Sequence, residues 1–505
     1  MNTAPPITPP ALLNPPLPTR PGERRDWSGL KGASQALALA EAALAAPGPL
    51  LVVAADTPAA ERLEREIPFF AGAALPVLSF PDWETLPYDA FSPHQDLISE
   101  RLAALHRLPR LDRGVLIVPM ATLMQRLPPQ TYLDAYSLHL KRGDRLNLAD
   151  MRERLTRAGY TAVNQVMEHG EFAIRGGLLD LFPMGSDTPF RVELFDDEVD
   201  SIRRFDPDTQ RSQESLPGID LLPGREFPLN TAAIERFYQR YMEVFEANPA
   251  RSTLYRELQA GRPPAGIEFY LPLFFETTAT LFDYLPPGTL IAWQEGCLAA
   301  GDAFWSTVRE RYTAREIARD YPPLPPAELY LDPGAVFAGI KRFAQVALRE
   351  AADDYALAVA AAPALPVDSR AARPLAALED FVTGFAGRTL IAAESLGRRE
   401  TLREMLARQH IGVQVLDDWA QFLASDARLA IAVAPVDDGL LLPKAGIAIV
   451  AESQIYGEHV VQQRRRERRE TDPEAVIRNL TELAPGDPVV HIEHGVGRYL
   501  GLETL

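Results

Sequence analysis

The chain has 505 residues and a formal net charge of −18 at pH 7, which argues against broad electrostatic binding of nucleic acid by the chain as a whole. Its length allows about three to five domains of roughly 100 to 200 residues each. No apolar run approaches the roughly 20 residues that span a bilayer, and Cys297, the single cysteine, excludes internal disulfides and thiolate metal clusters.

The first 26 residues, MNTAPPITPPALLNPPLPTRPGERRD, are rich in proline. They lack the basic start and the apolar stretch that a signal peptide requires. We therefore expect a disordered leader at 1–26 and a cytoplasmic protein.

Residues 27–137 have the pattern of the first part of an α/β lobe of the P-loop helicase type. A helical composition at 30–44 precedes the apolar run at 50–56, and 114–129 repeats a strand followed by a short helix. Four apolar residues at helical spacing predict an amphipathic helix between these segments: Leu97, Ile98, Leu102 and Leu105. The aromatic and proline-rich segment at 80–91 is expected to be extended and packed against the lobe.

Residues 138–222 form a mixed, hairpin-rich insertion with two strand-like runs, 172–175 and 190–195, that alternate in character. One side of each run is apolar and is expected to face a core. The opposite face is expected to carry three residues together: Arg175, Arg191 and Phe195. Arginine and aromatic side chains are frequent at the energetic centre of protein interfaces, so this face predicts a docking site. The alternative is a two-sided sheet in which a helix of the same chain covers Phe195.

The chain returns to α/β character at 223–360, where 276–295 predicts a helix, a Pro-Pro-Gly turn and a buried strand. We expect a long helical stretch over 333–360. A proline-containing segment then marks a boundary, and short apolar strands predict a small α/β domain at 364–457.

Residues 458–480 predict an arginine-rich linker or helix. A helix there could lie beside a DNA duplex through five clustered arginines: Arg464, Arg465, Arg466, Arg468 and Arg469. The alternative is a solvated linker helix. Alternating valines and several glycines at 481–505 indicate the first strands of a small β-barrel.

Nucleotide and metal chemistry is not evident in the sequence. A P-loop needs G-x-x-x-x-G-K-[ST], because loop N–H groups and the lysine hold phosphates while the hydroxyl holds magnesium. Residues 30–37 read LKGASQAL, without that lysine and without paired glycines. His491 and His494 are three residues apart but have no further ligands nearby, so we expect no metal site.

The segment 170–212 resembles a partner-binding domain that the repair helicase UvrB shares with the transcription-repair coupling factor family. The resemblance rests on G-x-F-x-x-R-G-x-x-L-D-x-F-P, followed by R-x-E-x-F-x-D-E-x-x-S-I-x-x-F-D-P-x-T-Q-R-S. Four further stretches favour the coupling factors over UvrB: 80–102, 266–286, 451–458 and 486–502. The last resembles the opening of the barrel by which coupling factors and CarD-type regulators contact the β subunit of RNA polymerase.

The resemblance implies an N-terminal fragment that acts as a non-catalytic adaptor in transcription-coupled nucleotide excision repair. UvrA would bind the 138–222 domain, with Arg175, Arg191 and Phe195 at the matching contact positions. RNA polymerase would bind the barrel segment, with Leu505 as a contact. The lobe would carry a degenerate P-loop and no cofactor. ATP, magnesium and most contacts with double-stranded DNA would belong to missing motor domains, which make the whole protein an ATP-dependent translocase.

Two other functions stay open. The first is a UvrB-like, ATP-dependent helicase that binds damaged DNA, although 92–108 continues as a helix without the long aromatic hairpin by which UvrB clamps DNA. The second is a CarD-type regulator of RNA polymerase, which requires a complete barrel. The family resemblance also implies that an absent C-terminal domain masks the UvrA-binding face, so the fragment is expected to bind UvrA constitutively.

Overall fold

The structure is a computed structural model. It describes residues 11–245, 252–315, 321–351, 355–368, 370–371, 373–457, 488–491 and 495–498. Two compact units divide the chain: Met1–Pro207 with Arg211–Glu458, and Asp208–Gln210 with His459–Leu505. Within the described ranges, no helix combines the length and apolar character that a membrane crossing requires.

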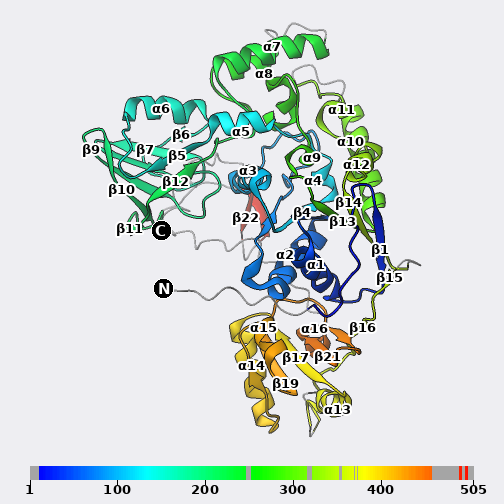
Figure 1. The fold of residues 1–505 in the computed structure, drawn as a ribbon. Helices are drawn as coiled ribbons and strands as arrows, with labels where there is room; N and C mark the ends of the chain where they lie inside the picture. Colours follow the sequence, from blue (N-terminus) through cyan, green and yellow to red (C-terminus); the bar gives the residue numbers. More distant parts are fainter. Residues whose placement is uncertain are drawn as a thin grey trace. The chain divides into compact units, whose positions relative to one another are not determined.

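A parallel sheet lies at the centre of the first unit (Figure 1). Its strands are β1 (Arg24–Ser28), β2 (Leu50–Ala54), β3 (Val77–Ser79), β4 (Val115–Pro119), β13 (Leu290–Gln294), β14 (Ala344–Leu348) and β15 (Tyr355–Ala356). They are ordered β15-β1-β14-β13-β2-β4-β3. In β2, Leu51 and Val53 face one core while Leu50 and Val52 face another, so the run is apolar throughout because both faces are covered.

Helices cover both faces of this sheet. One core contains side chains from α1 (Ser34–Ala45) and α2 (Thr57–Ala71). The other contains side chains from α3 (Gln95–Arg107), α4 (Met120–Leu123), α5 (Gln130–Tyr136), α7 (Thr231–Phe245), α8 (Thr253–Gln259), α9 (Leu281–Tyr284), α10 (Cys297–Arg315), α11 (Pro326–Leu329), α12 (Pro333–Ile340) and the 3-10 helix Ile267–Phe274. Two further 3-10 turns, Gly72–Ala74 and Leu108–Arg110, follow α2 and α3.

Most of the lobe elements expected from the sequence are present. The predicted amphipathic helix is α3, and its four apolar residues are buried. The segment at 80–91 packs on the lobe through Trp83 and Tyr88, which are buried, whereas Phe91 is exposed. The hydrophobic pattern was sufficient here because each element buries a face of its own.

The prediction of a long helix over 333–360 is wrong. The helix α12 ends at Ile340, and β14 begins at Ala344. This strand lies between β1 and β13, where Val346 and Leu348 are buried. Burial inside the sheet therefore outweighed the local helix propensity of an alanine-containing segment.

The prediction of a disordered leader at 1–26 is wrong for residues 11–26, which the structure describes. The backbone N–H groups of Leu12, Leu13 and Asn14 donate to the carboxylate of Glu41 on α1, at 2.6 to 3.2 Å. The Trp27 indole donates to the carbonyl of Pro16 at 3.0 Å. Contacts with residues distant in sequence fix this proline-rich segment, and its local composition does not reveal them.

The insertion after the first half of the lobe is a sheet with a helix on one face. Its strands are β6 (Thr161–Ala162), β7 (Glu171–Arg175), β8 (Leu178–Leu181), β9 (Phe190–Phe195), β10 (Glu198–Phe205) and β11 (Ser212–Ser215). A separate pair joins β5 (Leu138–Lys141) to β12 (Gly218–Leu221). The helix α6 (Leu148–Arg157) lies beside this sheet (Figure 1). Its residues Met151 and Leu155 belong to the same core as Phe172 and Val192.

A second α/β sheet follows the lobe. Its strands are β16 (Ala360–Ala361), β17 (Arg388–Ala393), β18 (Gln414–Val415), β19 (Leu429–Val433), β20 (Leu440–Leu442) and β21 (Ile447–Ala451). Its helices are α13 (Ala376–Gly384), α14 (Leu396–Arg408), α15 (Trp419–Ala424) and α16 (Glu452–Tyr456). In β17, Ile391 and Ala393 face a core shared with α13 and α14, while Leu390 and Ala392 face the core that contains α1 and α2.

In the second unit, the structure describes an antiparallel pair formed by β22 (Pro488–His491) and β23 (Gly495–Arg498). Both strands lie where the sequence predicts the start of a small barrel. The barrel itself stays a prediction. The described residues therefore form an α/β multidomain chain with several sheets.

Candidate functional site

The register of the 171–205 strands places Arg175, Arg191 and Phe195 on the same face of their sheet. Arg175 lies opposite Leu178, and Leu178 lies opposite Glu193, so these residues form one row across three strands. Arg191 and Phe195 lie two residues to either side of Glu193 on β9. We call Arg175, Leu178, Arg191 and Phe195 the docking face.

Two tight turns present the exposed members of the docking face: the turn at 176–177 between β7 and β8, and the turn at 196–197 between β9 and β10. Gly176, at a φ of +60°, and Gly177 join β7 to β8 directly after Arg175. The backbone of Leu194 bonds to the carbonyl of Gly177, so Phe195 stands beside a turn without side chains. The exposed fraction of Phe195 is 77%, and Leu178 is 37% exposed. The alternative interpretation required a helix of the same chain to cover Phe195. The described residues do not enclose the Phe195 ring, so they do not support that alternative.

Arg191 differs from the other members because its guanidinium is bound within the domain. Its Nε and a terminal nitrogen donate to the two carboxylate oxygens of Asp180 at 2.7 and 2.9 Å. The hydrogen bond to Asp180 raises the pKa of Arg191 above its usual value. The guanidinium also lies over the Phe205 ring, at 5.1 Å from its centroid. Only 18% of the Arg191 side chain is exposed, against 56% for Arg175.

Only one end of the docking face is exposed to solvent. A small core of its own covers the end away from the turns and contains Val166, Ala173, Phe182 and Phe205. The sequence pattern predicted one buried face and one exposed face. The second face is divided, with Arg191 at the border between the small core and the exposed end.

Sequence reasoning missed Asp180, the buried partner of both arginines. Asp180 is 3% exposed, and its Oδ2 also accepts from Arg175 at 3.4 Å. A signal was present, because a charged residue occurs between Leu179 and Leu181 in a buried strand. A buried carboxylate needs a cation nearby, and the candidate arginines were already identified.

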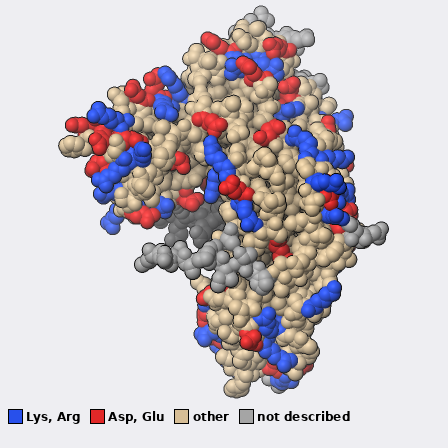
Figure 2. All heavy atoms as spheres, viewed as in Figure 1, with Lys and Arg blue, Asp and Glu red and all other residues tan. Residues whose placement is uncertain are grey.

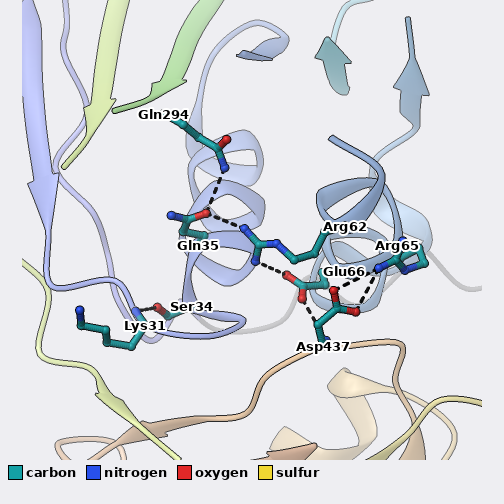
Figure 3. A network of polar contacts seen from close by, with 8 residues as sticks. All are labelled: Lys31, Ser34, Gln35, Arg62, Arg65, Glu66, Gln294 and Asp437. Atoms are coloured by element: carbon teal, nitrogen blue, oxygen red, sulfur yellow. Dashed lines mark hydrogen bonds and ion pairs between the residues drawn. The ribbon is translucent and has the colours of Figure 1, made fainter. Parts of the chain in front are cut away.

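A second polar cluster lies at the start of α1, where the loop after β1 enters the helix (Figure 3). The side chain of Gln35 accepts from Arg62 at 2.9 Å and from Gln294 at 3.2 Å. Gln294 in turn accepts from the N–H of Ala55 at 2.9 Å. The Ser34 hydroxyl accepts from the N–H of Lys31 at 2.7 Å. Polar groups of the chain thus bond one another at a loop-to-helix junction that could otherwise hold an anion.

The loop at 436–439, from the second α/β sheet, closes against this junction. The N–H of Ala33 donates to the carbonyl of Asp438 at 3.0 Å. A Cβ at Gly32, whose φ is +52°, would lie 2.1 Å from the carbonyl oxygen of Gly439. Glycine is therefore required at position 32 by both its backbone conformation and this close approach.

Glu66 on α2 links the same loop to the junction. Its carboxylate accepts from the N–H of Asp437 at 3.1 Å and pairs with Arg62 at 3.2 Å (Figure 3). Arg65 pairs with the Asp437 side chain at 3.0 Å. Burial raises the pKa of Glu66 to about 7, against the lowering effect of Arg62 and of the Asp437 N–H.

Several predicted site residues lie outside the described residues: Leu505, Arg464, Arg465, Arg466, Arg468 and Arg469. His491 belongs to β22, and His494 lies outside the described residues. In the part of the chain that the structure describes, no group of three or more potential metal ligands is found. On the face shown in Figure 2, acidic and basic side chains are interspersed.

Three family models match the chain. The UvrB interaction domain matches residues 138–227, the D3 domain of MFD matches 381–455, and the CarD-like/TRCF RID domain matches 483–505. The first match contains the docking face. The second contains the loop at 436–439.

Curated relatives match over nearly the whole chain. The transcription-repair-coupling factor of Escherichia coli (strain K12) is 42% identical over 97% of this chain and 43% of that protein. The corresponding protein of Haemophilus influenzae is 39% identical over 98% of this chain and 44% of its own length. That of Bacillus subtilis (strain 168) is 26% identical over 85% of this chain and 38% of its own length. The chain spans less than half the length of these relatives.

Proposed function

Because the chain belongs to the transcription-repair-coupling factor family over the part of those proteins that it spans, we propose that it is an adaptor in transcription-coupled nucleotide excision repair. It recruits UvrA through the docking face. It contacts the β subunit of RNA polymerase through the segment at 483–505, which matches the CarD-like/TRCF RID domain.

The observation that carries this proposal is the exposure of Arg175 and Phe195 on one face of the domain that matches the UvrB interaction family. A ring that is 77% exposed at a hairpin end has no packing role in the fold, but it offers a large rigid contact. Arginine and aromatic side chains are among the residues that most often dominate binding energy. The face therefore has the composition expected of a protein-binding site.

Alanine substitution tests the UvrA assignment. We expect Arg175→Ala and Phe195→Ala each to weaken binding of purified UvrA by about 1 to 4 kcal/mol, because each removes contact area from the centre of the interface. Isothermal titration calorimetry with the whole 505-residue chain measures this change.

Exposed residues of the second α/β sheet supply matched controls. Leu396 is 64% exposed, and the Arg408 side chain is 77% exposed, both on α14. Leu396→Ala and Arg408→Ala should leave the affinity for UvrA unchanged. Unaltered binding by Arg175→Ala and Phe195→Ala would refute the proposed docking face.

The first lobe supports binding and assembly, and no catalysis by this chain is proposed. Aligned to G-x-x-x-x-G-K-[ST], the loop beginning at Gly29 has Ser34, Gln35 and Ala36 at the positions of the second glycine, the lysine and the hydroxyl residue. This is a degenerate P-loop without the cation and the magnesium ligand. The UvrB-like helicase is accordingly the weaker alternative. ATP-dependent translocation on DNA is assigned to the remainder of the whole protein.

A further inference from the structure

Asp180 occupies an unusual position for a carboxylate. It lies on β8 between Leu179 and Leu181, and it is 3% exposed although it belongs to the same face as Arg175 and Phe195. A buried charge is costly unless hydrogen bonds and an opposite charge compensate it. Asp180 is compensated by the two arginines of the docking face, so all three side chains form one unit.

The bonds of this unit differ in strength. Arg191 forms a two-point contact with both carboxylate oxygens, at 2.7 and 2.9 Å. A planar guanidinium bound at two points is fixed in orientation as well as in position. The Phe205 ring beneath it, at 5.1 Å, adds a further contact. Arg175 reaches the same carboxylate through one nitrogen at 3.4 Å.

The register explains how one carboxylate serves both arginines. Asp180 lies directly opposite Arg191 on β9 and opposite Ala173 on β7. Arg175 is the next residue on the same face of β7, in a diagonal position that a long side chain can span. The Arg175 side chain spans this diagonal, and one of its terminal nitrogens donates to Asp180 at 3.4 Å.

We propose that Asp180 is a positioning residue of the docking face, and this inference rests on the proposed function. It holds Arg191 rigid and orients Arg175 toward an acidic surface of UvrA that also accepts Phe195 and Leu178. Two arginines and one aspartate leave one net positive charge on the unit. Ordering the two long side chains before binding reduces the conformational entropy that complex formation loses.

A double-mutant cycle tests the proposal. We expect Asp180→Asn to weaken UvrA binding by about tenfold in the otherwise unchanged chain, because the uncharged amide no longer holds two guanidinium groups. In the Arg191→Ala background, Asp180→Asn should cost less than about threefold, because the main group that it positions is gone. Titration calorimetry of purified UvrA into each whole-chain variant gives the affinities.

An equal loss of affinity in both backgrounds would mean that Asp180 acts on UvrA binding independently of Arg191, and that result would overturn the inference. Asp220→Asn is the matched control, since Asp220 is an exposed carboxylate of the same domain that pairs with His139 on the separate β5–β12 pair. It should bind UvrA like the unchanged chain.

Thermal unfolding of each variant identifies loss of the fold. If Asp180→Asn is unfolded, Arg191→Lys replaces it, because lysine keeps the charge but cannot form the two-point contact. About tenfold weaker binding by folded Arg191→Lys supports positioning, and binding equal to the unchanged chain contradicts it.

The two proposals can fail separately. If Phe195→Ala weakens UvrA binding while Asp180→Asn has no effect, only the positioning role of Asp180 fails. If the unchanged chain does not bind UvrA, both the proposed function and this inference fail.

Discussion

Two buried glutamates carry contacts that no local sequence pattern reveals. Glu41 fixes the backbone of 12–14 onto α1, and burial raises its pKa. Glu66 binds the N–H of Asp437, and burial raises its pKa to about 7. Each carboxylate accepts hydrogen bonds from backbone N–H groups of a distant part of the chain, so each side chain links two segments that are far apart in sequence.

The raised pKa of Glu66 makes part of the stability depend on pH. The carboxyl titrates near 4.5 when unfolded and at about 7 in the fold, so its contribution is fully present below pH 4.5 and is lost as pH rises through 7. This shift corresponds to on the order of 3 kcal/mol. Relative to Glu66→Gln, which keeps an oxygen for the Asp437 N–H, the unchanged chain should lose stability between pH 5 and pH 8.

Thermal unfolding of both proteins across this pH range provides the measurement. Glu61→Gln, on the same helix but only partly buried, is the control and should follow the unchanged chain. Parallel curves for the unchanged chain and Glu66→Gln would contradict the assignment of this titration to Glu66.

At the scale of elements, α1 and α2 contact two sheets at once. Trp419 on α15 packs edge-on against Phe70 of α2, with ring centroids 5.3 Å apart, and lies 5.9 Å from Phe69. Its core also contains residues of β2 and β21, such as Val52 and Ile449. The second α/β sheet therefore shares a hydrophobic core with the first lobe, and its docking holds the loop at 436–439 against α1.

Removing the Trp419 ring should loosen that contact. Trp419→Ala is expected to destabilise the chain by about 3 to 5 kcal/mol, through lost burial and the cavity left behind. Amide hydrogen exchange should accelerate in α1 and α2 as well as in α15. Phe381→Ala, on α13 at the opposite face of the same sheet, is the control and should affect α13 and α14 only. Unchanged exchange in α2 of Trp419→Ala would show that the two sheets are stabilised independently.

At the scale of the whole molecule, the first lobe is a layered parallel sheet, and the loop-to-helix junction after β1 is occupied by groups of its own chain. Gln35 is bonded to Arg62 and Gln294, and the N–H of Ala33 is bonded to Asp438. A phosphate would have to displace these groups. The residues at 34–36, which do not match the P-loop pattern, and the closure by the 436–439 loop both disfavour phosphate binding at this junction.

We therefore expect no saturable binding of magnesium-ATP at millimolar concentration. The triple variant Ser34→Gly, Gln35→Lys and Ala36→Ser restores the P-loop pattern and should still fail to bind, because the carbonyl of Gly439 remains against Gly32. Calorimetric titration of both proteins checks this. Binding by the triple variant alone would show that the motif, and not the loop, sets the limit. Binding by the unchanged chain would favour the helicase alternative.

The sequence by itself determined the elements that bury a face of their own and the alternation that brings Arg175, Arg191 and Phe195 to one side of a sheet, because period and register act over a few residues. Only the tertiary structure decided that Arg191 is held by Asp180, that residues 11–26 are ordered and that 344–348 is a strand. It also decided that the second α/β sheet closes the junction at α1. These features depend on contacts between segments far apart in the chain, and such contacts leave no local periodicity to detect.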